Sequence, residues 1–167
     1  MPETSTPFTI AVSDEVLADL HARLRNTLWP DELDGVGWDY GATVEATKHL
    51  CTYWLESFDW RGAEARLNAW PQFTTTIDGQ NIHYAHLRSP HPNAFPLIIT
   101  HGWPGSISEF LAIADPLVHP TDPADAFDLI IPSIPGYGFS GPTVDRGWNV
   151  ARVGRAWARP SHVPRLR

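Results

Sequence analysis

Two continuous apolar runs, at residues 95–100 and 127–131, are the strongest indication of the fold of this chain. A continuous run is typical of a strand that is buried on both faces of a sheet. Residues 106–118 lie between the runs and repeat apolar side chains at helical spacing. A strand, a helix and a strand in this order predict a βαβ unit, and with it a mostly parallel sheet covered by helices, which is an α/β fold.

The chain ahead of this unit has a helical pattern. Ser13 and the two acidic residues after it begin a stretch with a leucine every three or four residues, which predicts a helix that Pro30 ends. Residues 43–55 and 59–70 predict two further helices. Five tryptophans lie in this half of the chain, and we expect them to form a thick aromatic core rather than a ligand cage: Trp29, Trp38, Trp54, Trp60 and Trp70.

Two further elements complete the predicted secondary structure. Residues 73–77 and 81–88 flank the dipeptide Asp78-Gly79, and this pattern predicts a β-hairpin. A last helix is predicted at residues 149–159, where Pro160 stops it.

Composition excludes several classes of function. The chain has 167 residues, 43% of them hydrophobic, with 16 Pro and 12 Gly, which is typical of one globular domain with many turns. Cys51 is the single cysteine, so a disulfide scaffold and a cysteine-based zinc site are excluded. All 19 acidic residues lie at or before Asp145, which argues against nucleic-acid binding even though residues 146–167 carry six Arg. No apolar run is long enough to span a membrane and the first residues lack signal-peptide features, so we expect a cytoplasmic protein.

Chemistry is expected in the loops that follow the two buried strands, since ligands of open α/β sheets lie beyond the carboxyl ends of the strands. The first loop reads His101-Gly102-Trp103-Pro104-Gly105-Ser106. Its glycines allow a tight turn before a helix, which would leave backbone N–H groups around Trp103 free to donate to a developing oxyanion. The second loop, residues 132–142, is rich in Pro and Gly, which indicates a fixed shape. Spacing alone favours ordinary turn chemistry for both loops, and that alternative stays open.

Other candidate sites fail on their own spacing. Ser140 lacks the second glycine of a nucleophile elbow, because Pro142 stands there. His83 and His86 are three apart on a predicted strand, so they point to opposite faces and are not expected to share a metal ion. His101 ends a buried strand, and a structural hydrogen-bonding role is favoured for it. No nucleotide-binding glycine motif follows either strand, and no metal or cofactor is predicted.

The same residues resemble a known family. The segments Pro71-Gln72-Phe73-Thr74-Thr75-Thr76-Ile77-Asp78-Gly79-Gln80-Asn81-Ile82-His83, His101 to Ser106 and Pro132-Ser133-Ile134-Pro135-Gly136-Tyr137-Gly138-Phe139-Ser140-Gly141-Pro142 are similar to the microsomal-type epoxide hydrolases of the α/β-hydrolase fold. The helical part from Phe8 to Trp70 resembles the N-terminal region of that family, and the resemblance runs on to about Trp157.

The resemblance implies hydrolysis of an epoxide to a diol in two steps. An aspartate in that family attacks the ring carbon to form an ester, and a histidine paired with an acid activates the water that cleaves it. The backbone N–H of the Trp in the His-Gly-Trp-Pro segment helps to stabilise the oxyanion, and Trp103 matches that position. His101, Gly102, Pro104 and Gly105 would then support the oxyanion loop.

The resemblance also implies residues that this sequence does not contain. The family's elbow with the nucleophilic Asp, the catalytic acid, the His and the cap with its two tyrosines would all follow the last predicted helix, and none is present. We therefore predict a helical meander at residues 1–70, the first strands and helices of an incomplete α/β-hydrolase sheet at 71–158, and an aberrant tail at 159–167. Such a chain is expected to be inactive alone.

Three interpretations remain open at this point. The first is the N-terminal portion of an epoxide hydrolase, whose substrate in the complete enzyme is a small-molecule epoxide. The second is a non-catalytic interaction module or one half of a split hydrolase, with a C-terminal hydrolase half or self-association as its partner. The third is another α/β-hydrolase reaction, such as ester or haloalkane cleavage, which the residues of the first loop make less favoured.

Overall fold

The computed structural model describes residues 5–158. Two compact units divide the chain. One unit combines the chain up to Ile10 with the chain from Ala65 onward, and the other is Ala11–Glu64. We refer to them as the sheet unit and the helical unit.

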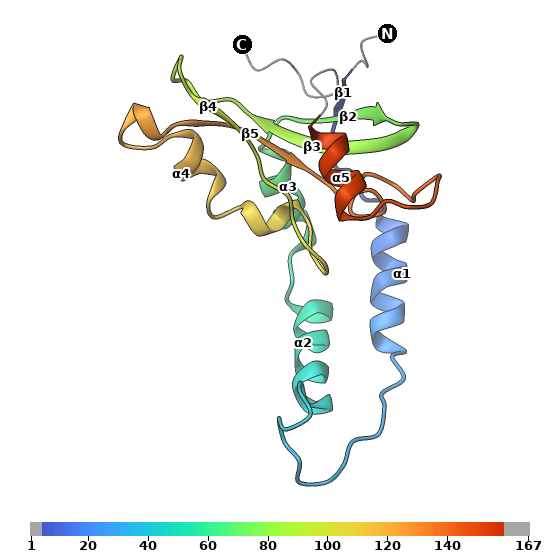
Figure 1. Ribbon diagram of the computed structural model, residues 1–167. Helices are drawn as coiled ribbons and strands as arrows, with labels where there is room; N and C mark the ends of the chain where they lie inside the picture. Colours follow the sequence, from blue (N-terminus) through green and yellow to red (C-terminus); the bar gives the residue numbers. More distant parts are fainter. Residues whose placement is uncertain (1–4, 159–167) are drawn as a thin grey trace. The chain divides into compact units, whose positions relative to one another are not determined.

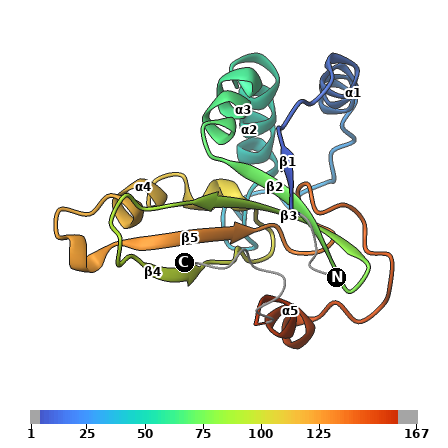
Figure 2. The same ribbon diagram turned by 90° about the horizontal axis from the view of Figure 1, so that it is seen from above.

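The sheet unit contains five strands in the order β1-β2-β3-β5-β4 (Figures 1 and 2). Their bounds are β1 (Thr6–Phe8), β2 (Gln72–Ile77), β3 (Gln80–Leu87), β4 (Phe95–Ile98) and β5 (Phe127–Pro132). The strands β4 and β5 pair in parallel, with Leu97 opposite Leu129, as the predicted βαβ unit requires. The expectation that both are buried on both faces is wrong for β4, which contains no buried residue because it lies at the edge of the described sheet. The expectation of a mostly parallel sheet is wrong for the described strands, because β1, β2, β3 and β5 pair antiparallel.

The β2–β3 hairpin forms at the predicted turn. Asp78 and Gly79 have φ angles of 52° and 77°, and Ile77 pairs with Gln80 on either side of them. Positive φ at both central residues matches the right-handed twist of the flanking strands, and Asp-Gly adopts it at low cost. This prediction is confirmed.

The single helix expected at residues 106–118 is wrong. The structure has a short 3-10 helix, η1 (Ile107–Phe110), and a separate helix α4 (Ala114–Val118). Pro116 explains the break, because inside one continuous helix its ring would clash with the preceding turn and its missing N–H would remove a hydrogen bond. In α4 it lies in the first turn, where no such hydrogen bond is needed.

Helix α5 (Val150–Trp157) covers the β2–β3 hairpin. The Asn149 side chain caps it by accepting a hydrogen bond from the Arg152 N–H at 3.0 Å. Its buried Ala156 belongs to a cluster with Ile77 and Ile82, to which the half-buried Trp148 and Trp157 add. The predicted stop at Pro160 and the predicted tail at 159–167 lie outside the described residues.

The helical unit contains α1 (Asp14–Arg25), α2 (Val44–Glu56) and the start of α3 (Trp60–Asn68). The side chains of Ser13 and Thr43 cap α1 and α2. Helix α1 ends at Arg25, before the predicted Pro30. Asn26 caps it with its backbone N–H, and the Thr27 hydroxyl donates to carbonyls of the last turn.

The expected aromatic core of this half is wrong. No residue of α1 or α2 is buried, and the side chains of Trp38 and Trp54 are 67% and 43% exposed. The other three indoles, of Trp29, Trp60 and Trp70, are half-buried. The physical reason is the small number of elements, since two helices and part of a third bury too little area to enclose such large side chains.

Candidate functional site

The two loops singled out by the sequence meet at one edge of the sheet. Since β4 and β5 are parallel neighbours, the loops after them leave from the same edge. His101 joins the loops: its Nε2 accepts a hydrogen bond from the Ile134 N–H at 3.1 Å, and its ring lies 5.4 Å from that of Tyr137. The side chain of His101 is buried.

The group of Trp103 that could take part in chemistry is its backbone N–H, not its indole. The indole is 82% exposed, and the peptide bond between Trp103 and Pro104 is cis. The backbone N–H of Trp103 has no hydrogen-bond acceptor within residues 5–158. It is therefore available to donate to an external oxygen, as an oxyanion site requires.

The glycines of the first loop differ in what they do. A Cβ on Gly102 would meet nothing within 4 Å. A Cβ on Gly105 would lie 2.9 Å from the Gly102 carbonyl oxygen and would clash with the Glu109 carboxylate. That carboxylate accepts a hydrogen bond from the Ser106 N–H as part of a capping box. Gly105 is thus required by packing, whereas Gly102 is not.

The second loop is held in one shape by its own hydrogen bonds. Gly136 donates to the Gly141 carbonyl at 2.9 Å, and Gly136, Gly138 and Gly141 all have positive φ. The hydroxyl of Ser140 is fully buried, donates to the Ser133 carbonyl at 2.6 Å and accepts from the His83 N–H at 3.0 Å. Ser140 is therefore a structural residue and is not placed as a nucleophile.

Behind the second loop lies a buried polar network that sequence reasoning missed. The His83 ring bonds the Ser133 hydroxyl through Nδ1 at 2.9 Å and the Gln72 side-chain oxygen through Nε2 at 2.8 Å. The rings of Phe8 and Phe139 lie within 5.4 Å of it. Burial lowers the pKa of His83 to about 4, since the ring has no ionised partner to offset desolvation. The signal for this network in the sequence is weak: polar residues at buried strand positions.

The surroundings of His86 differ from those of His83. Its side chain lies on the opposite face of β3 from that of His83, and its Nε2 is buried with no hydrogen-bond partner in the described part of the chain. Desolvation lowers the pKa of His86. Among residues 5–158 no three His, Cys, Asp or Glu side chains come together as a metal site, and no helix is long and apolar enough to cross a membrane.

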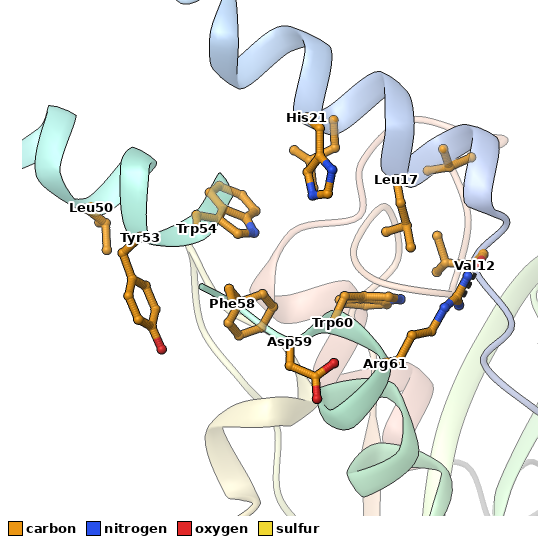
Figure 3. A pocket seen from close by; sticks show the side chains of 12 residues that line it. Val12, Leu17, His21, Leu50, Tyr53, Trp54, Phe58, Asp59, Trp60 and Arg61 are labelled. Carbon is orange, nitrogen blue, oxygen red and sulfur yellow. Dashed lines mark hydrogen bonds between the residues drawn. The ribbon is translucent and has the colours of Figure 1, made fainter. Parts of the chain in front are cut away.

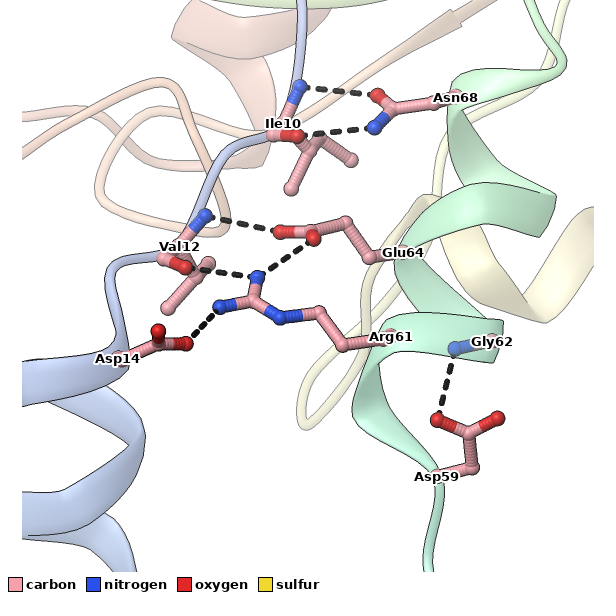
Figure 4. Close-up of polar contacts among 8 residues, drawn as sticks. All are labelled: Ile10, Val12, Asp14, Asp59, Arg61, Gly62, Glu64 and Asn68. Carbon is pink, nitrogen blue, oxygen red and sulfur yellow. Dashed lines mark hydrogen bonds and ion pairs between the residues drawn. The ribbon is translucent and has the colours of Figure 1, made fainter.

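A polar clasp in the helical unit ties the segment before α1 to α3 (Figure 4). Arg61 donates to the Val12 carbonyl at 2.8 Å and to Glu64 at 2.7 Å, and it pairs with Asp14. Glu64 in turn accepts from the Val12 N–H at 2.8 Å, which together with Arg61 lowers the pKa of its carboxyl. Since no catalytic pair is formed here, the clasp is structural.

The helical unit also carries an apolar groove, which Figure 3 shows from close by. Its volume is about 750 Å³, within the range of ligand or peptide sites. Its walls come from α1, α2 and the start of α3, and its main apolar members are Leu17, Leu20, Leu50, Trp54, Phe58 and Trp60. Of the five tryptophans that were expected to form a core, Trp54 and Trp60 line this groove.

Comparison with known proteins identifies the family. The family model described as "Epoxide hydrolase N terminus" matches residues 5–110, which is more than half of the chain. The chain belongs to the epoxide hydrolase family. The predicted resemblance is thereby confirmed.

Relatives and solved structures of epoxide hydrolases agree with this assignment. Juvenile hormone epoxide hydrolase 2 of Ctenocephalides felis is 40% identical over 88% of this chain and 32% of its own length. Epoxide hydrolase 1 of Sus scrofa is 37% identical over 92% of this chain and 36% of its own length. The chain therefore spans about a third of the length of these relatives.

Two epoxide hydrolase structures share the fold. The Aspergillus niger enzyme is 41% identical with a TM-score of 0.73, over 86% of this chain and 38% of its own. The juvenile hormone epoxide hydrolase of Bombyx mori is 32% identical with a TM-score of 0.83, over 93% of this chain and 42% of its own. These likenesses confirm the predicted fold class, a helical segment followed by the first strands and helices of an α/β-hydrolase sheet.

Proposed function

We propose that this chain supplies the oxyanion-stabilising part of an enzyme that hydrolyses epoxides to diols. The observation that carries the proposal is the backbone N–H of Trp103, which has no acceptor among residues 5–158 and lies at the edge of the sheet where two loops meet. Family membership and the His101–Ser106 segment support epoxide hydrolysis over ester or haloalkane cleavage.

The proposed chemistry divides between this chain and residues that it does not contain. An aspartate carboxylate attacks an epoxide carbon, the carbon–oxygen bond opens, and the ring oxygen takes a proton. Activated water then adds to the carbonyl of the resulting ester, and the negative charge develops on the carbonyl oxygen. The Trp103 N–H stabilises that oxygen, and collapse releases the diol and regenerates the aspartate.

His101, Gly102, Pro104 and Gly105 support the donor in this proposal. His101 ties the first loop to the second, and Gly105 leaves the space that the Gly102 carbonyl occupies. Cytoplasmic location, and the division of the chain at residue 70, remain predictions from the sequence.

Co-expression tests the proposal. The chain is produced with the part of the Aspergillus niger epoxide hydrolase that it does not match, and diol formation from styrene oxide is measured. Diol above that made by either piece alone supports the proposal. A stable complex of the two pieces without diol would refute it. The Trp103→Phe variant keeps the backbone N–H and is expected to retain activity.

A second candidate function is a non-catalytic interaction module, and the groove of the helical unit favours it. Side chains such as Leu50 and Tyr53 are 63% and 54% exposed there, which is unusual for apolar residues gathered in one place. The partner proposed is a C-terminal hydrolase half. Binding of that half without any gain in diol formation would favour this function over the first.

A further inference from the structure

We propose that His101 is a positioning residue that orients the Trp103 N–H, and that the Ile134 N–H of the second loop fixes the tautomer of His101 that does this. We call the Ile134 N–H, the His101 ring and the Gly102–Trp103 peptide group the relay. The proposal rests on the function proposed above for Trp103. It assigns a distinct task to each nitrogen of one buried imidazole ring.

The first step of the argument is the peptide group that His101 holds. Its Nδ1 lies 2.9 Å from the Gly102 carbonyl oxygen. That carbonyl and the Trp103 N–H belong to the same planar peptide unit, so fixing the direction of one fixes the direction of the other. A hydrogen bond from His101 to the carbonyl therefore orients the donor on its opposite side.

The second step is the tautomer of the ring. The Ile134 N–H can only donate, so the His101 Nε2 that receives it at 3.1 Å must be unprotonated. A neutral ring then carries its proton on Nδ1, which is the form that donates to the Gly102 carbonyl. The hydrogen bond from the second loop thus selects the tautomer that holds the first loop.

The third step is the rigidity of the two loop segments that His101 joins. Ile134 follows Ser133, whose hydroxyl bonds His83 and whose N–H donates to the His83 carbonyl at 2.8 Å. On the other side, Gly105 leaves room for the Gly102 carbonyl. Because the side chain of His101 is 3% exposed, water has little access to replace either of its hydrogen bonds.

The relay is tested by NMR on the intact chain, labelled with ¹⁵N, in solution or as a sediment by magic-angle spinning. The ring ¹⁵N shifts of His101 report which nitrogen carries the proton. We expect protonated Nδ1 and unprotonated Nε2, the minor tautomer of a free histidine. Protonated Nε2 would overturn the proposal, and this reading requires no variant.

Two variants separate the relay from plain packing. His101→Phe keeps a ring against Tyr137 but loses both hydrogen bonds, whereas His101→Asn retains an amide donor near the Nδ1 position. We expect the order parameter of the Trp103 amide to fall from about 0.85 to below about 0.6 in the first variant and to stay high in the second. The Ser106 amide, held by Glu109, serves as the internal control.

The two variants decide between a positioning role and a packing role for His101. An ordered Trp103 amide in His101→Phe would refute the relay. Equal loss at Trp103 and Ser106 would assign His101 a packing role instead. These readouts need neither substrate nor nucleophile, so a failed diol assay and a failed relay are distinguishable.

Discussion

His83 shows how a single buried residue links the stability of this fold to pH. The ring is fully buried beside aromatic side chains, and its hydrogen-bond partners within residues 5–158 are the neutral side chains of Ser133 and Gln72. Such a site accepts the neutral imidazole and rejects the charged one. The residue therefore affects stability in a defined pH window, whatever its part in function.

We predict that the free energy of unfolding falls as the pH decreases from about 6.5 to about 4. The pKa of His83 is about 4 in the folded chain against an ordinary 6.5, so between these values the unfolded chain binds more protons. The stability that the neutral ring contributes is complete above pH 6.5, and about 3 kcal/mol is lost by pH 4.

Urea unfolding at several pH values measures this loss. The His83→Gln variant should have a weaker pH dependence, with a remaining slope from His86, whose pKa burial also lowers. Unfolding free energy that does not change across the window would contradict the account.

Gly102 and Gly105 lie in the same loop but differ in the space around them, so their alanine variants form a matched comparison. Gly105→Ala should cost about 1 to 3 kcal/mol, because its Cβ meets the Gly102 carbonyl, whereas Gly102→Ala should leave stability almost unchanged. Equal effects of the two substitutions in a denaturant titration would show that the loop tolerates a Cβ at Gly105.

Residue-level prediction from sequence succeeded where the chemistry is local. The turn at Asp78-Gly79 and the cap at Ser13 follow from short-range hydrogen bonding and φ preference. The hydrogen-bond partners of His83 could not be predicted in this way, because strand pairing between segments far apart in sequence brings Ser133 and Gln72 to the ring.

Among the helices, α2 shows how threonine side chains bond to the backbone at a helix end and inside the helix. Thr43 caps α2 by accepting from the Ala46 N–H at 3.0 Å, whereas Thr52 returns its hydroxyl to the Lys48 carbonyl within the helix. Two residues of one type in one helix thus have opposite relations to the backbone.

We predict that Thr43→Ala destabilises the helical unit by about 1 kcal/mol, since an orphan N–H loses its acceptor. Thr52→Ala serves as the control and should be neutral or slightly stabilising, because the carbonyl that it frees keeps its helical partner and Ala is the better residue inside a helix. Helicity followed by circular dichroism during thermal unfolding distinguishes them. A larger loss in the Thr52 variant would contradict the capping argument.

Strand β4 lies at the edge of the described sheet, and Phe95 on it is 68% exposed. An exposed apolar edge strand promotes pairing with another chain. We predict that Phe95→Lys lowers concentration-dependent self-association in sedimentation velocity. Val144→Lys places the same charge at an exposed apolar residue outside the strands and should change little. Equal effects of both would attribute the change to net charge.

At the scale of the whole molecule, sequence reasoning succeeded for the β4–β5 pair and failed for the direction of the other described strands and for burial. Two apolar runs and the stretch between them correctly gave the parallel β4–β5 pair and the edge where the loops meet. Burial of the tryptophans was wrong, because apolar spacing shows which face of a helix is apolar but not whether anything covers it. The same limit explains the groove of the helical unit.

Replacement of a single main-chain atom tests whether the Trp103 N–H takes part in catalysis. In the enzyme reconstituted by co-expression, the α-hydroxy analogue of tryptophan at position 103 turns the peptide N–H into an ester oxygen and keeps the indole. We predict that kcat falls by about 10²- to 10³-fold, as for other single oxyanion donors, while Trp103→Phe stays near the parent rate. An unchanged kcat in the ester variant would contradict the claim.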